Sequence, residues 1–278
     1  MPHIVIKKCV FFLNKNQLNT ELRIMGNSKI DFERKKWNEY YGLALEGKGQ
    51  ESEPSLWWQI SDDDSVEIVK KYSDQSGNLN VLEAGCGSGG SSFYLGTIFR
   101  NIGITLCDIS ENALTYAKFI EPIELSGKVR YVRSSISSMP FPENTCDLTW
   151  NVGVVEHYNP NEILQMATEM MRVTKAGGNV IISIPNRNSI ATLKAYFLGS
   201  GFGTKFFQWV PGYRFDSEIL YRKSELYKIL STGLRRDVSV EFAGNLLWVS
   251  APQLLVRLTN KWFRQSGFSF LTFFIIRK

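Results

Sequence analysis

Apolar runs of strand length alternate with helical patterns through the middle of the chain. The strand-like runs lie at 80–84, 102–107, 129–132, 146–152 and 179–184. Helical patterns lie between them at 91–99, 110–120 and 162–173, with another ahead of the first strand at 62–72. Strands that alternate with helices form parallel βαβ units. The pattern therefore predicts an α/β fold with a doubly wound, Rossmann-like sheet and helices on both faces.

The C-terminal part adds a helical pattern at 224–231 and strand patterns at 236–242 and 268–276, which makes seven strands in a mostly parallel sheet. Residues 187–221 are rich in glycine and aromatic residues, fit no βαβ unit, and are expected to form an aromatic-rich lid insertion. Residues 245–264 have the apolar spacing of a helix, which either packs on the core or faces lipid.

The N-terminal region interrupts the regular alternation. We expect residues 1–60 to form an appendage and cap, and residues 61–278 to form the main domain. Aromatic side chains gather in 31–60, where they serve either core packing or a lid. Asp62–Asp64 are expected at the N-terminal end of the helix at 62–72, where the positive end of the helix dipole favours carboxylates.

Composition narrows the possible classes of function. The four cysteines form no CxxC pair, which indicates reduced thiols and a cytoplasmic location. Two histidines are too few for a multi-histidine metal site, and no apolar run has membrane-spanning length. The net charge of +5 is uneven, because residues 187–278 carry fourteen Lys or Arg against five Asp or Glu. This basic part is either a solvated face or an attractor of acidic partners. Its basic residues are too dispersed for a nucleic-acid site, and peripheral membrane contact stays open.

A glycine-rich turn follows the first strand, in the order Glu83-Ala84-Gly85-Cys86-Gly87-Ser88-Gly89-Gly90. Glycines at a strand-to-helix turn let the backbone approach a ligand closely, at the sheet edge where open α/β sheets bind ligands. Asp108, at the end of the second strand, is placed to accept hydrogen bonds from ribose hydroxyls. Glycine spacing does not decide between NAD and S-adenosylmethionine.

Three ordered features resemble class I S-adenosylmethionine-dependent methyltransferases of the small-molecule, methyltransferase domain 11-like type. They are the Glu-x-Gly-x-Gly-x-Gly form of 83–89, the Met-Pro-Phe and Cys-Asp-Leu passages at 139–141 and 146–148, and the Arg-Val-Thr-Lys-Ala-Gly-Gly turn at 172–178. Together they cover about residues 80–186. Against a short-chain reductase, no tyrosine has a lysine four residues after it.

The resemblance implies a role for each matching residue around the cofactor. Gly85, Gly87 and Gly89 would approach its methionine portion, with Glu83 fixing the turn.

Five further positions would hold the rest of the cofactor. Asp108 would bind the ribose, and Ile109, Ser135 and Ile136 would lie at the adenine. Asn151, at the end of the fourth strand, would face the methyl donor. At the sequence level a strand-end Asp108 is expected to matter for binding and little for fold stability.

Glu156 and His157 follow the fourth strand on the expected acceptor side. The Val-Val-Glu-His stretch at 154–157 resembles ubiquinone-pathway O-methyltransferases. Where relatives carry an additional magnesium-binding Glu, this chain has Gly153, so we expect no metal. His157 is either a substrate-side base or a structural residue at a helix start.

The sequence thus predicts an enzyme that transfers a methyl group from S-adenosylmethionine to an oxygen or nitrogen of a small molecule. The alternatives are methylation of a macromolecule, a nicotinamide-dependent oxidoreductase, and a non-catalytic cofactor-binding protein on the same fold.

Overall fold

The computed structural model describes residues 29–48, 56–73, 77–207, 217–247 and 251–278. Most of the expected appendage and the middle of the expected lid lie outside these ranges. The division of the chain into an appendage, a domain and two insertions therefore stays a prediction.

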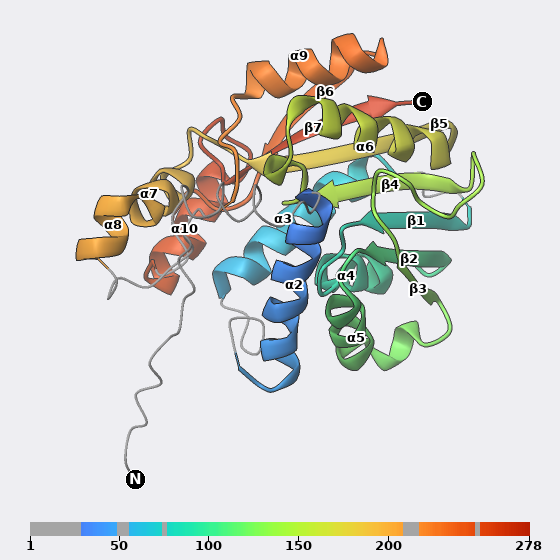
Figure 1. The fold of residues 1–278 in the computed structure, drawn as a ribbon, viewed down its shortest axis with the longest axis horizontal. Coiled ribbons are helices and arrows are strands. Elements are labelled where there is room, and N and C mark those ends of the chain that lie inside the picture. The colour runs from blue at the N-terminus through green and yellow to red at the C-terminus, as the bar shows by residue number, and fades with distance from the viewer. Residues whose placement is uncertain (1–28, 49–55, 74–76, 208–216, 248–250) are drawn as a thin grey trace.

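A single seven-stranded sheet forms the centre of the molecule, in the order β3-β2-β1-β4-β5-β7-β6 (Figure 1). Its strands are β1 (Leu79–Ala84), β2 (Ile102–Asp108), β3 (Val129–Arg133), β4 (Cys146–Val152), β5 (Thr174–Pro185), β6 (Val238–Ala243) and β7 (Leu271–Arg277). The first five strands pair in parallel, and β7 runs antiparallel to both β5 and β6. The predicted mostly parallel, seven-stranded α/β sheet is confirmed.

Helices cover both faces of this sheet. They are α2 (Lys29–Leu45), α3 (Leu56–Lys71), α4 (Gly90–Ile98), α5 (Glu111–Ile120), α6 (Pro160–Val173), α7 (Ile190–Gly199), α8 (Gly201–Phe206), α9 (Lys223–Leu234) and α10 (Gln253–Phe263). Helices α3, α4 and α5 share one buried cluster with the sheet, and α6 and α9 share the other. Alternate residues of a strand supply the two clusters, as Val81 and Leu82 of β1 do.

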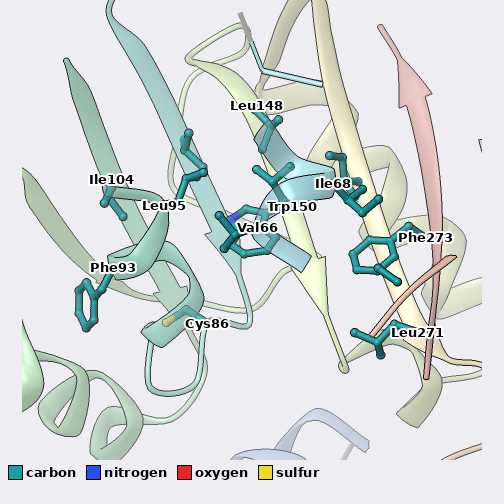
Figure 2. Close-up of a cluster of buried hydrophobic side chains, with 14 of the residues drawn as sticks. Val66, Ile68, Cys86, Phe93, Leu95, Ile104, Leu148, Trp150, Leu271 and Phe273 are labelled. Atoms are coloured by element: carbon teal, nitrogen blue, oxygen red, sulfur yellow. The ribbon is translucent and has the colours of Figure 1, made fainter. Parts of the chain in front are cut away.

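Large apolar side chains fill the layer between the sheet and α3. Trp150 of β4 and Phe273 of β7 are fully buried there beside Val66 and Ile68 of α3 (Figure 2). The central strands are buried on both faces, which explains why their sequences read as nearly continuous apolar runs. This packing holds the carboxyl ends of β1, β2 and β4 at one edge of the sheet.

Local caps fix where two helices begin. The Ser110 hydroxyl accepts a hydrogen bond from the N–H of Ala113 at the start of α5, as expected of an N-cap. Helix α6 begins earlier than predicted, because Asn159 and Glu162 form a capping box around Pro160.

The structure corrects one sequence expectation and adds helices that the sequence did not predict. Helix α3 begins at Leu56, so Asp62–Asp64 lie in its middle and not at its N-terminal end. Helix α2 was not expected at all. The described part of the expected lid contains two short helices, α7 and α8, and α10 occupies the predicted helical insertion.

Candidate active site

A cavity of about 390 Å³ lies at the carboxyl ends of the parallel strands. This size is within the range of roughly 300–1,000 Å³ that small-molecule sites have. The turns after β1, β2, β3 and β4 line one side, and α2 and α3 line the other. Of the predicted site residues, the cavity lining includes Glu83, Gly85, Gly87, Asp108, Ile109, Ser135, Ile136, Glu156 and His157. Gly89 and Asn151 are not part of it.

The glycine turn needs its glycines for two different reasons. Gly85, Gly87 and Gly89 all have positive φ, at 77, 53 and 71°. A Cβ on Gly85 would lie 2.6 Å from Val154 across the cavity wall, and one on Gly87 would meet the Tyr41 hydroxyl. Glycine at these positions therefore allows the left-handed backbone conformation and leaves no Cβ to fill the cavity.

Gly89 plays a structural part in the same turn. It is the N-cap of α4, and a Cβ there would lie 2.5 Å from a Leu106 methyl group. A Cβ on Gly89 would thus point into the core, and the approach of the Gly89 backbone to the cofactor stays a prediction. Cys86, between the two cavity-lining glycines, is 7% exposed, and burial raises the pKa of its thiol well above the usual value.

Asp108 is tied to the glycine turn as well as to the cavity. One carboxylate oxygen accepts a hydrogen bond from the N–H of Gly87 at 2.9 Å, and the other accepts one from the N–H of Ser110 at 2.8 Å. Burial raises the pKa of Asp108, and these backbone hydrogen bonds act in the opposite direction. Each oxygen keeps a lone pair for a ligand hydroxyl, since a carboxylate has about four acceptor sites.

Glu83 is a second buried carboxyl at this end of the cavity. Burial raises its pKa to about 8, and the nearby carboxylates of Asp62 and Asp108 add to the rise. Its Oε2 atom is buried without a hydrogen-bond partner. Asp62, from α3, also lines the cavity, so three carboxyl groups surround this end. Such a grouping favours a ligand that brings positive charge and hydrogen-bond donors.

The residues expected at an adenine ring line the same cavity. Ile136 is buried, and its Cδ1 lies 3.2 Å from the position of a Cβ on Gly85. The hydroxyl of Ser135 lies 2.8 Å from that of Ser137, which orients the short turn after β3. Ile109 and Ser135 are partly exposed in the cavity wall.

Asn151 is fully buried behind this wall. Its side-chain amide donates to the carbonyl of Ala84 at 2.5 Å and so ties the end of β4 to the end of β1. The side chain of Asn151 therefore supports the sheet edge. The predicted contact of Asn151 with a methyl donor, through its backbone, stays a prediction.

Glu156 and His157 lie in a short 3₁₀ turn, η2 (Val155–His157), after β4. Both side chains are buried, and both line the cavity. Burial raises the pKa of Glu156 to about 8, and the carboxylates of Glu218 and Glu33 raise it further. Its Oε2 atom has no hydrogen-bond partner, which leaves this atom available to a ligand.

His157 is held by residues distant in sequence. Its Nδ1 lies 2.8 Å from the Ser217 hydroxyl, which in turn accepts a hydrogen bond from the Lys36 ammonium at 2.9 Å. The Trp37 ring packs edge-on against the imidazole at 6.0 Å. Burial lowers the pKa of His157, while Glu33 and Glu218 oppose this change. The imidazole is therefore neutral near pH 7 and capable of accepting a proton.

Helix α2 supplies a cavity wall that sequence analysis did not identify as a helix. Trp37, Tyr40 and Tyr41 line the cavity, as does the buried carboxylate of Glu33, whose ion pair with Lys29 spans 2.6 Å. The aromatic residues of 31–60 were the sequence feature that pointed to this wall. Glu33 and Ser217 could not be predicted as site residues, because neither belongs to a motif.

Asn38 attaches α2 to the rest of the site. Its side-chain oxygen accepts hydrogen bonds from the Ser110 hydroxyl at 2.8 Å and the Asn112 N–H at 3.3 Å. The Asn112 side chain returns a hydrogen bond to the Asn38 carbonyl. These contacts place α2 over the ends of β1 and β2.

Among the described residues, no three His, Cys, Asp or Glu side chains are grouped closely enough to hold a metal ion. Gly153, at the position of the magnesium-binding Glu of relatives, has a φ of 72°.

Comparison with known proteins gives a consistent result. Residues 81–178 match a family described as a methyltransferase domain. A ubiquinone biosynthesis O-methyltransferase from Rickettsia akari is 29% identical over 168 residues, which are 59% of this chain and 61% of that protein. The chain thus spans about six-tenths of the length of this curated relative.

Solved structures share the fold. The magnesium protoporphyrin IX methyltransferase of Synechocystis PCC 6803, solved with bound SAH, has a TM-score of 0.56 at 17% identity, over 90% of this chain and all of that one. A possible histamine N-methyltransferase from Thermotoga maritima has a TM-score of 0.56 at 14% identity, over 79% of this chain and 90% of that one. With the domain match, the ordered motifs and this fold, the chain contains a methyltransferase domain of the class I S-adenosylmethionine-dependent type.

Proposed function

We propose that this protein transfers a methyl group from S-adenosylmethionine to an oxygen or nitrogen atom of a small molecule. The observation that carries the proposal is one cavity with two chemically different ends. The glycine turn, Glu83 and Asp108 form one end, and Glu156 and His157 form the other. A donor and an acceptor bound at these ends would meet within one enclosed space, which favours transfer through proximity and orientation.

The cofactor end suits this ligand in charge and shape. The sulfonium of S-adenosylmethionine supplies the driving force for transfer when the cofactor is bound. In this proposal the partnerless Oε2 of Glu83 accepts a hydrogen bond from an amino group of the cofactor, and Asp108 accepts from the ribose hydroxyls. The bare backbone at Gly85 and Gly87 allows close approach.

The acceptor end holds two groups able to accept a proton. His157 is neutral near pH 7, and its ring is oriented by Ser217 and Trp37. A hydroxyl acceptor would gain from a base here, whereas a neutral amine would need orientation alone. Trp37, whose ring packs against His157, shields this end and provides apolar contact area for the acceptor.

Calorimetry with S-adenosylhomocysteine and with NADH tests the cofactor. We expect micromolar binding of the former and no binding of the latter; the reverse pattern would favour the oxidoreductase alternative.

A screen with labelled methyl donor against pools of metabolites, nucleic acid and protein then tests the acceptor. Label in the macromolecular pools alone would contradict a small-molecule substrate. A cytoplasmic location stays a prediction.

A further inference from the structure

Two helices turn apolar side chains toward solvent. On α10, Leu254, Leu258 and Trp262 follow one another at four-residue spacing on one face, and they are 69, 49 and 74% exposed. On α7, Leu193 and Phe197 repeat this spacing and are also exposed. A surface helix of a globular protein normally buries its apolar stripe, so this arrangement is the reverse of the usual one.

Both helices are nevertheless anchored on the protein by their inner faces. Val256 is the buried residue of α10, and Ala191, Ala195 and Leu198 are buried on the inner face of α7. Val256 and Ala191 belong to the same core cluster as the sheet. The helices therefore have fixed positions while most of their large apolar residues point outward.

These elements contribute to one surface. The Asn186 amide, ahead of α7, donates hydrogen bonds of 2.8 Å to the carbonyls of Gly267 and Ser269, which follow α10. Figure 1 places α7, α8 and α10 at the same end of the molecule. We call their exposed apolar residues the apolar end surface: Ile190, Leu193, Tyr196, Phe197, Phe202, Phe206, Leu254, Leu255, Leu258, Trp262, Phe263 and Phe268.

Positive charge surrounds the apolar end surface. Neither 187–207 nor 251–278 contains an Asp or Glu. Arg187, Lys205, Arg257 and Lys261 are exposed, and none of them pairs with an acid of the described residues. On α10, Arg257 and Lys261 are one turn apart and flank the Leu254–Trp262 face.

We propose that the apolar end surface binds the interface of an anionic lipid bilayer. An amphipathic helix with aromatic and leucine side chains on one face and Lys and Arg beside them lies in the plane of such an interface. Apolar side chains would enter the headgroup boundary, while the basic residues contact anionic headgroups. Among the described residues, no helix is long and apolar enough to cross a membrane.

A second copy of the chain fits this surface less well. A symmetric pair would bring the same basic residues of both copies together, with no acid in either helix segment to compensate them. An anionic bilayer satisfies the apolar and the basic parts at once.

The surface also lies beside the cavity. Phe270 lines the cavity, and Phe268, two residues before it, is 60% exposed on the apolar end surface. Pro185 lines the cavity shortly before α7 begins. Membrane contact would thus be made next to the site, although the proposal does not depend on the reaction.

Co-sedimentation of the full chain with phosphatidylglycerol vesicles and with phosphatidylcholine vesicles tests the proposal. We expect binding to the anionic vesicles that weakens with added salt, and at least about tenfold weaker binding to the neutral ones. Trp262→Glu and, separately, Lys261→Glu should each lower binding to anionic vesicles by roughly tenfold. Phe119→Glu, at an apolar residue that is 79% exposed on α5, is the matched control and should bind as the parent does.

Thermal melts of all three variants establish that they fold. Lack of binding to anionic vesicles by the folded parent would overturn the proposal. The proposal would also be overturned if Trp262→Glu and Phe119→Glu lost vesicle binding equally, or if Lys261→Glu bound anionic vesicles as the parent does. Dimerisation that Trp262→Glu abolishes, without vesicle binding, would assign the surface to a second copy instead.

Discussion

The carboxylate of Asp108 accepts a hydrogen bond from the backbone N–H of Gly87, so the residue predicted to hold a ribose also holds the glycine turn. A second bond, from the N–H of Ser110, joins the same carboxylate to the start of α5. The turn after β1 and the turn after β2 therefore share one side chain.

Asp108→Ala should weaken S-adenosylhomocysteine binding and also destabilise the fold by about 1.5–3 kcal/mol, because two backbone donors lose a charged acceptor. This revises the sequence expectation that the fold would hardly change. Calorimetry and urea unfolding measure the two effects. Glu111→Ala, which removes an exposed carboxylate paired with Arg133, is the control and should change stability by under about 1 kcal/mol.

The stability of the ligand-free protein should fall as pH rises from about 6.5 through about 8. Burial raises the pKa values of Glu83 and Glu156 to about 8, so the folded state keeps protons that the unfolded state has released. Urea unfolding across this range measures the slope. Glu83→Gln and Glu156→Gln should each flatten it, and Glu124→Gln, at an exposed position, should not. A flat parent profile would contradict ionisation of these groups within this range.

His157→Ala should lower turnover while leaving S-adenosylhomocysteine affinity nearly unchanged, because the ring lies at the acceptor end. For a hydroxyl acceptor, His157→Asn should be nearly as poor, with a loss of roughly 10²–10⁴-fold. For an amine acceptor, the Asn variant should keep most activity. Full activity in both variants would make His157 a structural residue.

Ser217→Ala should lower turnover less than the His157 variants do. The Ser217 oxygen has two acceptor lone pairs, so it can accept hydrogen bonds both from the Lys36 ammonium and from Nδ1–H of His157. In that arrangement Nε2 carries no proton and can act as the base, and loss of Ser217 frees the tautomer and the ring orientation. Steady-state kinetics over a pH series measures the change. A turnover equal to that of the parent would contradict a role of Ser217 in orienting the ring.

Gly87→Ala should abolish cofactor binding, since the new methyl group would enter the cavity at the Tyr41 hydroxyl. The φ of 53° should also destabilise the fold by roughly 1–2 kcal/mol. Gly127→Ala is the matched control, with a φ of 79° and nothing within 4 Å of the new methyl group. It should show a similar loss of stability with normal binding by calorimetry.

The strands and helices of the parallel part of the sheet followed from sequence because each βαβ unit carries its own local pattern. The run at 80–84 with its glycines, and Asp108 after the next run, identified the ligand edge without any tertiary information. The central strands could be recognised in the sequence as apolar runs because helices cover both of their faces.

Helix α2 could not be read in the same way. Its inward-facing residues include Glu33 and Asn38, whose reason for being there is a contact with η2 or with α5. Ser217 reaches His157 from 60 residues away, with no motif around it. Polar residues that are required by a distant partner do not contribute to the hydrophobic periodicity from which a helix is predicted.

Cys86 gives the glycine turn a built-in chemical reporter. Of the cysteines in the described residues, Cys86 alone lines the cavity, while Cys107 and Cys146 are buried elsewhere. Its thiol is protonated and shielded, so alkylation requires the turn to open. In a Cys9→Ser background, the rate of Cys86 alkylation would therefore measure the opening of an empty site, and its decrease with added ligand would measure occupancy without any knowledge of the acceptor.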